Sequence, residues 1–210
     1  MERSNILKAP KLKQSFIEVH RREQIIDTAI ETIATRGYHE TSLADIANNA
    51  GISKGVIPYY FNSKEELIEE IKSILEIEWN SYVKLRVEAQ TTASEKMRAY
   101  VDSFIEYAMH NRNKFLATAD LWINLSSKDE GPLFSRAAYR EARRHIKRIL
   151  RIGQERGEFK PFPLEIIATI IQGVIDGVLF QWIFDPEAID FDECRQRIFE
   201  MIEGYINKRG

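Results

Sequence analysis

Apolar residues recur at helical spacing along most of the chain. Ile25, Ala29 and Ile33 lie on one face of a predicted first helix, because an α-helix returns to the same face every three or four residues. No segment shows the strict alternation of apolar and polar residues that predicts a β-strand. The pattern therefore predicts an all-α protein of about nine helices. The predicted helices cover residues 20–36, 42–50, 53–61, 64–82, 92–110, 115–123, 133–156, 164–184 and 191–207.

Two of the short helical patterns lie close together within residues 41–64. Ser42 and Asp45 have the spacing of a capping box, in which each side chain accepts a hydrogen bond from the other residue's backbone N–H. Gly51 follows this helix, at a position where glycine can adopt the left-handed conformation that redirects the chain. Ser53 is then placed to cap the next helix. The segment is therefore predicted to be a helix-turn-helix.

The longest predicted helix starts at Lys64, directly after the helix-turn-helix. Ser63 and Glu66 have capping-box spacing at its start. Its apolar stripe extends from Leu67 to Tyr82. Because one continuous helix leads from the first segment into the rest of the chain, we expect it to connect two domains and to act as a lever between them.

The segment around the helix-turn-helix closely resembles the tetracycline-repressor (TetR) family. The resemblance rests on a helix that ends in Gly51, followed by Ser53-Lys54-Gly55, Ile57, Tyr59-Tyr60-Phe61 and Lys64. It covers residues 20–66 and is denser than an isolated short motif. It implies a three-helix DNA-binding domain at residues 20–66. It also implies that residues 67–210 form a larger helical domain that dimerises and binds a small effector.

The same resemblance implies a set of DNA contacts. Ser53 and Lys54 are expected to contact phosphates, and Gly55 is expected to let the backbone approach DNA closely. Val56 takes the place of a base-facing residue and can offer only apolar contact. For Tyr60, packing against the first helix is an equally good expectation. The implied DNA-binding residues are Thr41, Ser42, Ser53, Lys54, Gly55, Val56, Tyr59, Tyr60 and Lys64.

Pro58 departs from the most familiar form of this motif, in which an aromatic residue occupies the position. Proline has no backbone N–H, and inside a helix its ring crowds the carbonyl group four residues earlier. If Ser53 caps the second helix, Pro58 lies too deep for the free first turn. The second helix is therefore expected to start late or to be locally distorted.

Effector binding and dimerisation are implied by the resemblance for residues 67–210. The implied ligand-binding residues are Phe104, Tyr107, Trp122, Tyr139, Asp176 and Phe180. The alternative for each aromatic side chain is packing in a helical core, and a structural hydrogen bond would equally explain Asp176 within an apolar helix. The last two helices, at 164–184 and 191–207, are apolar over wide arcs. The resemblance implies that they pair with their copies in a homodimer.

Charge is distributed unevenly, although the net charge of the 210 residues is only −2. Residues 1–64 hold 9 Lys and Arg against 7 Asp and Glu, whereas residues 65–210 hold 21 against 25. The acidic part does not exclude DNA binding, since basic side chains need only gather on the contact surface. Residues 1–19 are predicted to form a flexible basic arm, which either follows phosphates or is a solvated tail. The basic run within residues 133–156 is predicted to be the solvated face of an amphipathic helix.

Cysteine content and the N-terminal residues indicate a cytoplasmic protein. The single cysteine, Cys194, cannot form an intrachain disulfide, which fits a reducing compartment. The first residues lack the apolar core of a signal peptide. The most apolar segment, 164–184, is interrupted by Gln172, Asp176 and Gln181, and is predicted to be a buried helix rather than a membrane span.

The sequence offers little for catalysis or metal binding. Residues 51–55, Gly-Ile-Ser-Lys-Gly, have the form of the serine-hydrolase elbow, but that elbow needs a preceding β-strand, which the pattern does not predict. The four histidines show no pair at metal-ligand spacing. No glycine-rich phosphate loop is present. We therefore expect no enzyme, no cofactor and no metal site.

These observations together predict a homodimeric transcription regulator. The expected activity is that of a repressor, which a small-molecule effector releases from a pseudo-palindromic operator in double-stranded DNA. A helical protein-binding adaptor without DNA binding is the alternative from another class, and a serine hydrolase is a remote third. Salt-dependent binding to duplex DNA would distinguish the regulator from the adaptor.

Overall fold

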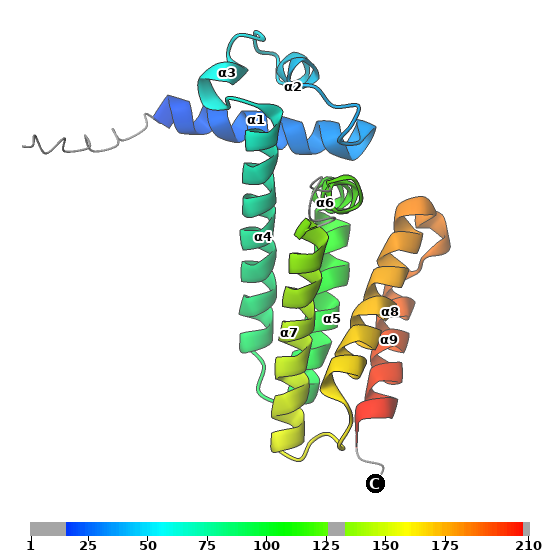
Figure 1. Cartoon of the computed structure of the whole chain (residues 1–210). Helices are drawn as coiled ribbons and strands as arrows, with labels where there is room; N and C mark the ends of the chain where they lie inside the picture. The colour runs from blue at the N-terminus through cyan, green and yellow to red at the C-terminus, as the bar shows by residue number, and fades with distance from the viewer. Residues whose placement is uncertain (1–15, 126–132, 208–210) are drawn as a thin grey trace, which may run out of the picture.

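The chain folds into helices joined by short connections (Figure 1). The computed structural model describes residues 16–125 and 133–207, and within them β structure is limited to an isolated bridge between Phe159 and Asn207. The predicted all-α class is confirmed. The helices are α1 (Phe16–Arg36), α2 (Leu43–Asn49), α3 (Ile57–Tyr60), α4 (Lys64–Glu88), α5 (Ala93–His110), α6 (Arg112–Asn124), α7 (Leu133–Glu155), α8 (Leu164–Phe184), the short 3-10 helix η1 (Pro186–Ala188) and α9 (Phe191–Ile206).

The start of the chain differs from the predicted boundary. Residues 1–15 of the predicted basic arm lie outside the described residues, as does the predicted loop at 126–132. The predicted end of the arm at residue 19 falls inside α1, which begins at Phe16. Phe16 and Ile17 are exposed, so this first turn has no apolar stripe facing the core from which its helical structure could have been predicted.

Helices α1, α2 and α3 and the first turns of α4 form a head at one end of the molecule (Figure 1). α1 lies across the end of α4, and the long helices extend away from the head. α6 also enters this head, because its Ala117 and Leu121 are buried in the same core. The other buried side chains of the head core are Ile25, Ile26, Ala29, Ile30, Ile33, Ile46, Ala47, Ile57, Phe61, Leu67, Ile68, Ile71 and Leu75.

A second core lies among α4, α5, α7, α8 and α9, which form a bundle below the head (Figure 1). α5 is central, since it packs against each of the other four helices. Its buried Tyr100, Val101 and Ile105 meet Ile146 of α7 and Ile175 of α8 in one cluster. The two cores give the chain a small domain and a larger one, with α4 and α6 contributing to the structure of both.

The predicted helix ends around α2 and α4 are observed with one difference. Ser42 and Asp45 form the complete capping box of α2, and Gly51 adopts a positive φ of 65°. At the start of α4, the Ser63 side chain accepts from the backbone N–H of Glu66, as predicted. The Glu66 carboxylate, however, accepts from the backbone and side chain of Asn62, one residue before the position that a capping box requires.

The expectation that Ser53 caps the second helix of the motif is wrong. α3 spans only Ile57–Tyr60, and its first flanking residue is Val56, which makes no side-chain cap. Pro58 therefore lies in the first turn, where its missing N–H leaves no hydrogen bond unmade. The prediction that Pro58 delays the helix is confirmed. Ser53 instead accepts from the backbone N–H of Val56 in the turn before α3.

α8 has one buried face and one exposed apolar face. Ile167, Ile171 and Ile175 are buried in the bundle, whereas Ile166 and Ile170 are 58% and 54% exposed. By length and composition alone, α8 could also cross a membrane. Core helices of soluble proteins meet the same criterion, and the buried face of α8 packs against α7, α5 and α9.

Candidate functional site

The outer surface of α2, α3 and the turn between them presents most of the predicted DNA-binding residues to solvent. Ser42, Ser53, Lys54 and Gly55 are exposed, and Tyr59 is 71% exposed. A Cβ added at Gly55 would meet no atom within 4 Å, so the backbone is open to an incoming molecule. This surface therefore combines hydroxyl groups, an ammonium group and accessible backbone, which are the groups that contact DNA phosphates.

Three predicted DNA-binding residues are engaged inside the head. Thr41 is 2% exposed, and its hydroxyl donates to the Gly37 carbonyl at 2.7 Å. Lys64 donates to the Tyr38 carbonyl and lies 4.0 Å from the centre of the Tyr38 ring. Burial lowers the pKa of Lys64. Tyr60 is half-buried against the head core, so both of the packing roles considered for it are compatible with its position.

Hydrogen bonds to α1 fix the helix-turn-helix in place. The Gln24 side chain donates to the Ala50 carbonyl at 2.9 Å, and Asn49 donates to the Thr32 hydroxyl at 3.0 Å. The Tyr59 hydroxyl donates to Glu18 Oε1 at 2.9 Å. α1 is thus the scaffold for the exposed surface, and Tyr59 must exchange the Glu18 carboxylate for another acceptor if it is to contact a phosphate.

A cavity of about 110 Å³ lies inside the bundle, below the head. Its walls are mainly aromatic and come from α4, α5, α6, α7 and α8. Two carboxylates, one histidine and one glutamine supply most of the polar groups. The lining residues are Leu75, Glu76, Trp79, Asn80, Val83, Tyr100, Phe104, Tyr107, Phe115, Thr118, Trp122, Ala138, Tyr139, Glu141, Ala142, His145 and Gln172.

The structure brings four of the six predicted ligand-binding residues to this cavity. These are Phe104, Tyr107, Trp122 and Tyr139, whereas Asp176 and Phe180 are not in its lining. Whether any of them binds a ligand stays a prediction. The wall residues contributed by α4, including Glu76 and Trp79, were not predicted. Trp79 belongs to the predicted apolar stripe of α4, but periodicity cannot distinguish a residue facing a cavity from one facing a filled core.

A chain of hydrogen bonds forms the floor of the cavity. The buried Tyr100 hydroxyl donates to Gln172 Oε1 at 3.0 Å, and Gln172 Nε2 donates to Asp176 Oδ1 at 2.7 Å. Burial raises the pKa of Asp176 to about 6, although hydrogen bonds from Gln172 and Tyr139 oppose that rise. Burial and the nearby Asp176 raise the pKa of Tyr139 to about 12. The polar interruption of α8 thus has its hydrogen-bonding partners in the fold, which is the structural role considered for Asp176.

α6 connects the cavity wall to the head. Thr118 and Trp122 line the cavity, while Asp120 faces the loop after α1. The Asp120 carboxylate accepts from the backbone N–H of Tyr38 at 2.7 Å. The same Tyr38 carries the ammonium of Lys64 on its carbonyl and ring. A shift of α6 would therefore change contacts at both the start of α2 and the start of α4.

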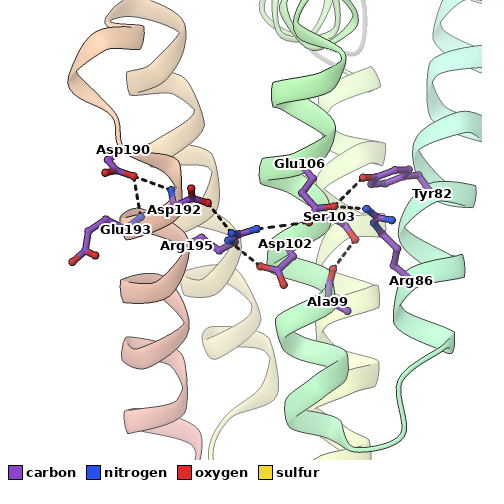
Figure 2. Close-up of polar contacts among 10 residues, drawn as sticks. All are labelled: Tyr82, Arg86, Ala99, Asp102, Ser103, Glu106, Asp190, Asp192, Glu193 and Arg195. Atoms are coloured by element: carbon purple, nitrogen blue, oxygen red, sulfur yellow. Dashed lines mark hydrogen bonds and ion pairs between the residues drawn. The ribbon is translucent and has the colours of Figure 1, made fainter.

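A charged bridge connects the last helix to α4 through α5 (Figure 2). Arg195 of α9 lies 3.7 Å from Asp102 Oδ1 and 3.7 Å from Glu106 Oε1 of α5. Glu106 also pairs with Arg86 of α4 and accepts from the Tyr82 hydroxyl at 3.3 Å. Burial raises the pKa of Asp102, and Arg195 opposes that rise. This bridge fixes the far half of α4 relative to α9.

Comparison with known proteins gives matches over both domains. The family model for bacterial regulatory proteins of the tetR family matches residues 25–71, and that for the C-terminal part of BetI-type transcriptional repressors matches residues 93–207. The HTH-type transcriptional regulator BetI 1 of Chromohalobacter salexigens is 26% identical over 189 residues, covering 87% of this chain and 89% of that protein. The fatty acid metabolism regulator protein of Bacillus subtilis is 23% identical, covering 89% and 95%.

Solved structures share the fold over most of the chain. A transcriptional regulator from Saccharomonospora viridis in complex with choline has a TM-score of 0.80 at 24% identity, covering 91% of this chain and all of that one. FadR from Bacillus subtilis in complex with stearoyl-CoA has a TM-score of 0.73 at 23% identity, covering 86% and 96%. At these identities the likeness is one of fold.

Proposed function

From the premise that the chain belongs to the TetR family of bacterial regulatory proteins, and is a DNA-binding transcriptional regulator with ligand-responsive repression, we propose how it binds DNA, dimerises and senses its effector. The surface of α2 and α3 binds the operator, and the cavity among α4 to α8 binds the effector. One observation carries this proposal. The helices that form the cavity wall, α4 and α6, are also packed into the DNA-binding head. The protein acts in the cytoplasm, and its function is binding rather than catalysis.

Dimerisation uses the exposed apolar face formed by α8 and α9. Ile166, Ile170 and Phe184 of α8 share this face, and a Cβ at the intervening Gly173 would meet no atom within 4 Å. Large exposed apolar patches usually mark an interface, and a two-fold pairing buries the same patch on both copies. A two-fold dimer matches a pseudo-palindromic operator, with half-sites about 34–36 Å apart.

Replacement of Ile170 with arginine should raise the dimer dissociation constant by about 20-fold, because each copy would bury an unpaired charge at the interface. Sedimentation over a concentration series would measure this change. Ile77→Arg is the matched control, since Ile77 is a similarly exposed isoleucine (64%) on α4, away from the proposed interface. Equal dissociation constants for the two variants would contradict the proposed dimer.

The cavity is suited to a small organic cation. Trp79 makes edge contacts with Phe104 and Tyr107, at 4.2 and 5.2 Å between ring centres, and the three rings line one part of the wall. Aromatic faces attract cations, and quaternary ammonium groups are held by such arrangements. Glu76 and Glu141 add negative charge to the lining. Drug-sized ligands occupy roughly 300–1,000 Å³, so a space of about 110 Å³ favours a smaller molecule. Choline, present in the structure from Saccharomonospora viridis, is a cation of this class.

Effector binding is coupled to DNA through α6 and α4. A ligand against Thr118 and Trp122 displaces α6, and with it the Asp120 carboxylate that orders Tyr38. α4 contacts the same ligand through Glu76 and Trp79 and begins in the head at Lys64. The charged bridge keeps the far half of α4 tied to α9, so movement at the cavity changes the head relative to the dimer face. The lever predicted for α4 thus shares its role with α6.

The Asp120→Asn variant should respond less to effector than the wild type. Choline should weaken operator binding of the wild type, within the ~5–150-fold range typical of allosteric coupling. The variant weakens the bond to the Tyr38 N–H, so this ratio should fall by about fivefold. Fluorescence anisotropy of labelled operator DNA, with and without choline, measures both ratios.

Glu155→Gln serves as the control for this experiment, because Glu155 is exposed on α7 and has no ion pair within the described chain. If Asp120→Asn responds as fully as Glu155→Gln, the proposed coupling through α6 is wrong. If choline changes operator binding of neither the wild type nor the control, the proposed effector class is wrong.

A further inference from the structure

Three carboxylates surround the cavity, and two of them are already neutralised. Glu141 pairs with Arg144 and lies 3.1 Å from His145 Nε2. Asp176, behind the floor, accepts from Gln172 and Tyr139. Glu76 differs, because within residues 16–125 and 133–207 no hydrogen bond or ion pair engages its carboxylate. It is the one lining carboxylate in the described chain whose charge has no partner.

Glu76 also occupies a distinct place in the cavity. It lies on α4, on the same helical face as Trp79 and Asn80, which follow it by three and four residues. Its side chain is exposed although it lines the cavity, which places it at the opening rather than in the interior. The aromatic walls can hold an apolar group of either charge state or none. A free carboxylate at the opening favours only a ligand that carries a positive charge.

We propose that Glu76 is the residue that makes the cavity select cationic over neutral ligands of the same shape. The proposal rests on the proposed effector site and adds to it the source of charge selectivity. A ligand cation positioned beside Trp79 lies close to the Glu76 side chain, so the ring face and the carboxylate act on the same charge. The other two carboxylates contribute less, because their hydrogen bonds and ion pairs already offset their charge.

The test uses a pair of ligands that differ only in charge. Choline and its neutral tert-butyl analogue, in which carbon replaces the nitrogen, have nearly the same shape. Isothermal titration of the purified full-length protein measures the affinity for each, and the ratio of the two affinities reports selectivity. The wild type should prefer choline by about tenfold. In Glu76→Gln this preference should fall by about fivefold, the upper range for an ion pair at a solvent-facing position.

The control variant is Glu88→Gln on the same helix. Glu88 is exposed and unpaired in the described chain, as Glu76 is, but it does not line the cavity, and its selectivity ratio should equal that of the wild type. An unchanged ratio in Glu76→Gln, with tight choline binding retained, would overturn the role of Glu76 and leave the effector site standing. A ratio that falls equally in both variants would also overturn it, since general electrostatics would then explain the preference. Failure of the wild type to bind either compound would refute the effector class and, with it, this inference.

Discussion

The double variant Lys54→Ala/Tyr59→Phe should bind operator DNA about 100-fold more weakly than the wild type, a loss of about 3 kcal/mol. Both side chains are exposed on the α2–α3 surface, so the substitutions remove possible DNA contacts without disturbing the head core. Each contact occurs twice in a dimer, so four contacts of about 1 kcal/mol each are lost in total. The loss should be visible in anisotropy titrations with operator DNA.

The salt dependence of binding tests the mechanism behind this loss. Removal of one phosphate contact per protomer should reduce the slope of log affinity against log salt by about two for the dimer. Lys84→Ala is the control, because Lys84 is an exposed lysine on α4 outside the head. Equal affinities and slopes for the double variant and this control would show that the α2–α3 surface does not contact the operator.

Lys64 is a poor choice for the same experiment, although the resemblance implies that it anchors a phosphate. Its ammonium lies on the carbonyl and ring of Tyr38, next to the Asp120 contact. Removing it would disturb the junction between the head and α6 as well as any DNA contact. A weaker operator complex in Lys64→Ala would therefore have two explanations, which the exposed Lys54 avoids.

The Gly153→Ala variant should lose about 3 kcal/mol or more of folding stability, equivalent to a fall of about 10 °C in Tm. A Cβ at Gly153 would lie 2.0 Å from Cδ2 of the Phe159 ring. Phe159 is buried, and its backbone N–H donates to the Gly153 carbonyl. Its backbone also pairs with Asn207. The ring cannot move aside without breaking these contacts, so the added methyl group overpacks the core.

Thermal unfolding followed by circular dichroism measures this loss. Gly204→Ala is the matched control, since Gly204 lies within a helix and an added Cβ would meet no atom within 4 Å. Alanine should there be neutral or stabilising, by up to about 1 kcal/mol, because it favours the helix. If Gly153→Ala unfolds at the wild-type temperature, the close approach of α7 and Phe159 is not a determinant of stability.

Local sequence patterns were sufficient for much of the DNA-binding head. The capping box at Ser42 and Asp45 acts over three residues, and the positive φ of Gly51 follows from its place after a helix. Pro58 carries the same kind of local information, and the delayed start of α3 was predicted from its chemistry. Ser53 misled because N-cap preference is only a weak local signal, which the steric requirement of Pro58 overrode.

The effector cavity could be predicted only in part. Aromatic residues on α5, α6 and α7 drew attention to themselves, and four of them line it. Glu76 gave no such signal, because an acidic residue on an exposed helical face has the same sequence context whether or not a cavity opens beside it. Phe180 lies on an equally aromatic helix but does not reach the cavity. Which side of a helix meets a void depends on how its neighbours are packed.

The sequence by itself determined the helical class, most helix boundaries and the membership of the family, because capping, turn chemistry and helical periodicity act within a few residues. Only the tertiary structure decided that α6 enters the head core, that Asp120 orders Tyr38, and that Gly153 must remain a glycine. Asp120 and Tyr38 are 82 residues apart in the chain. Contacts over such separations depend on the packing of whole helices, and no local pattern encodes them.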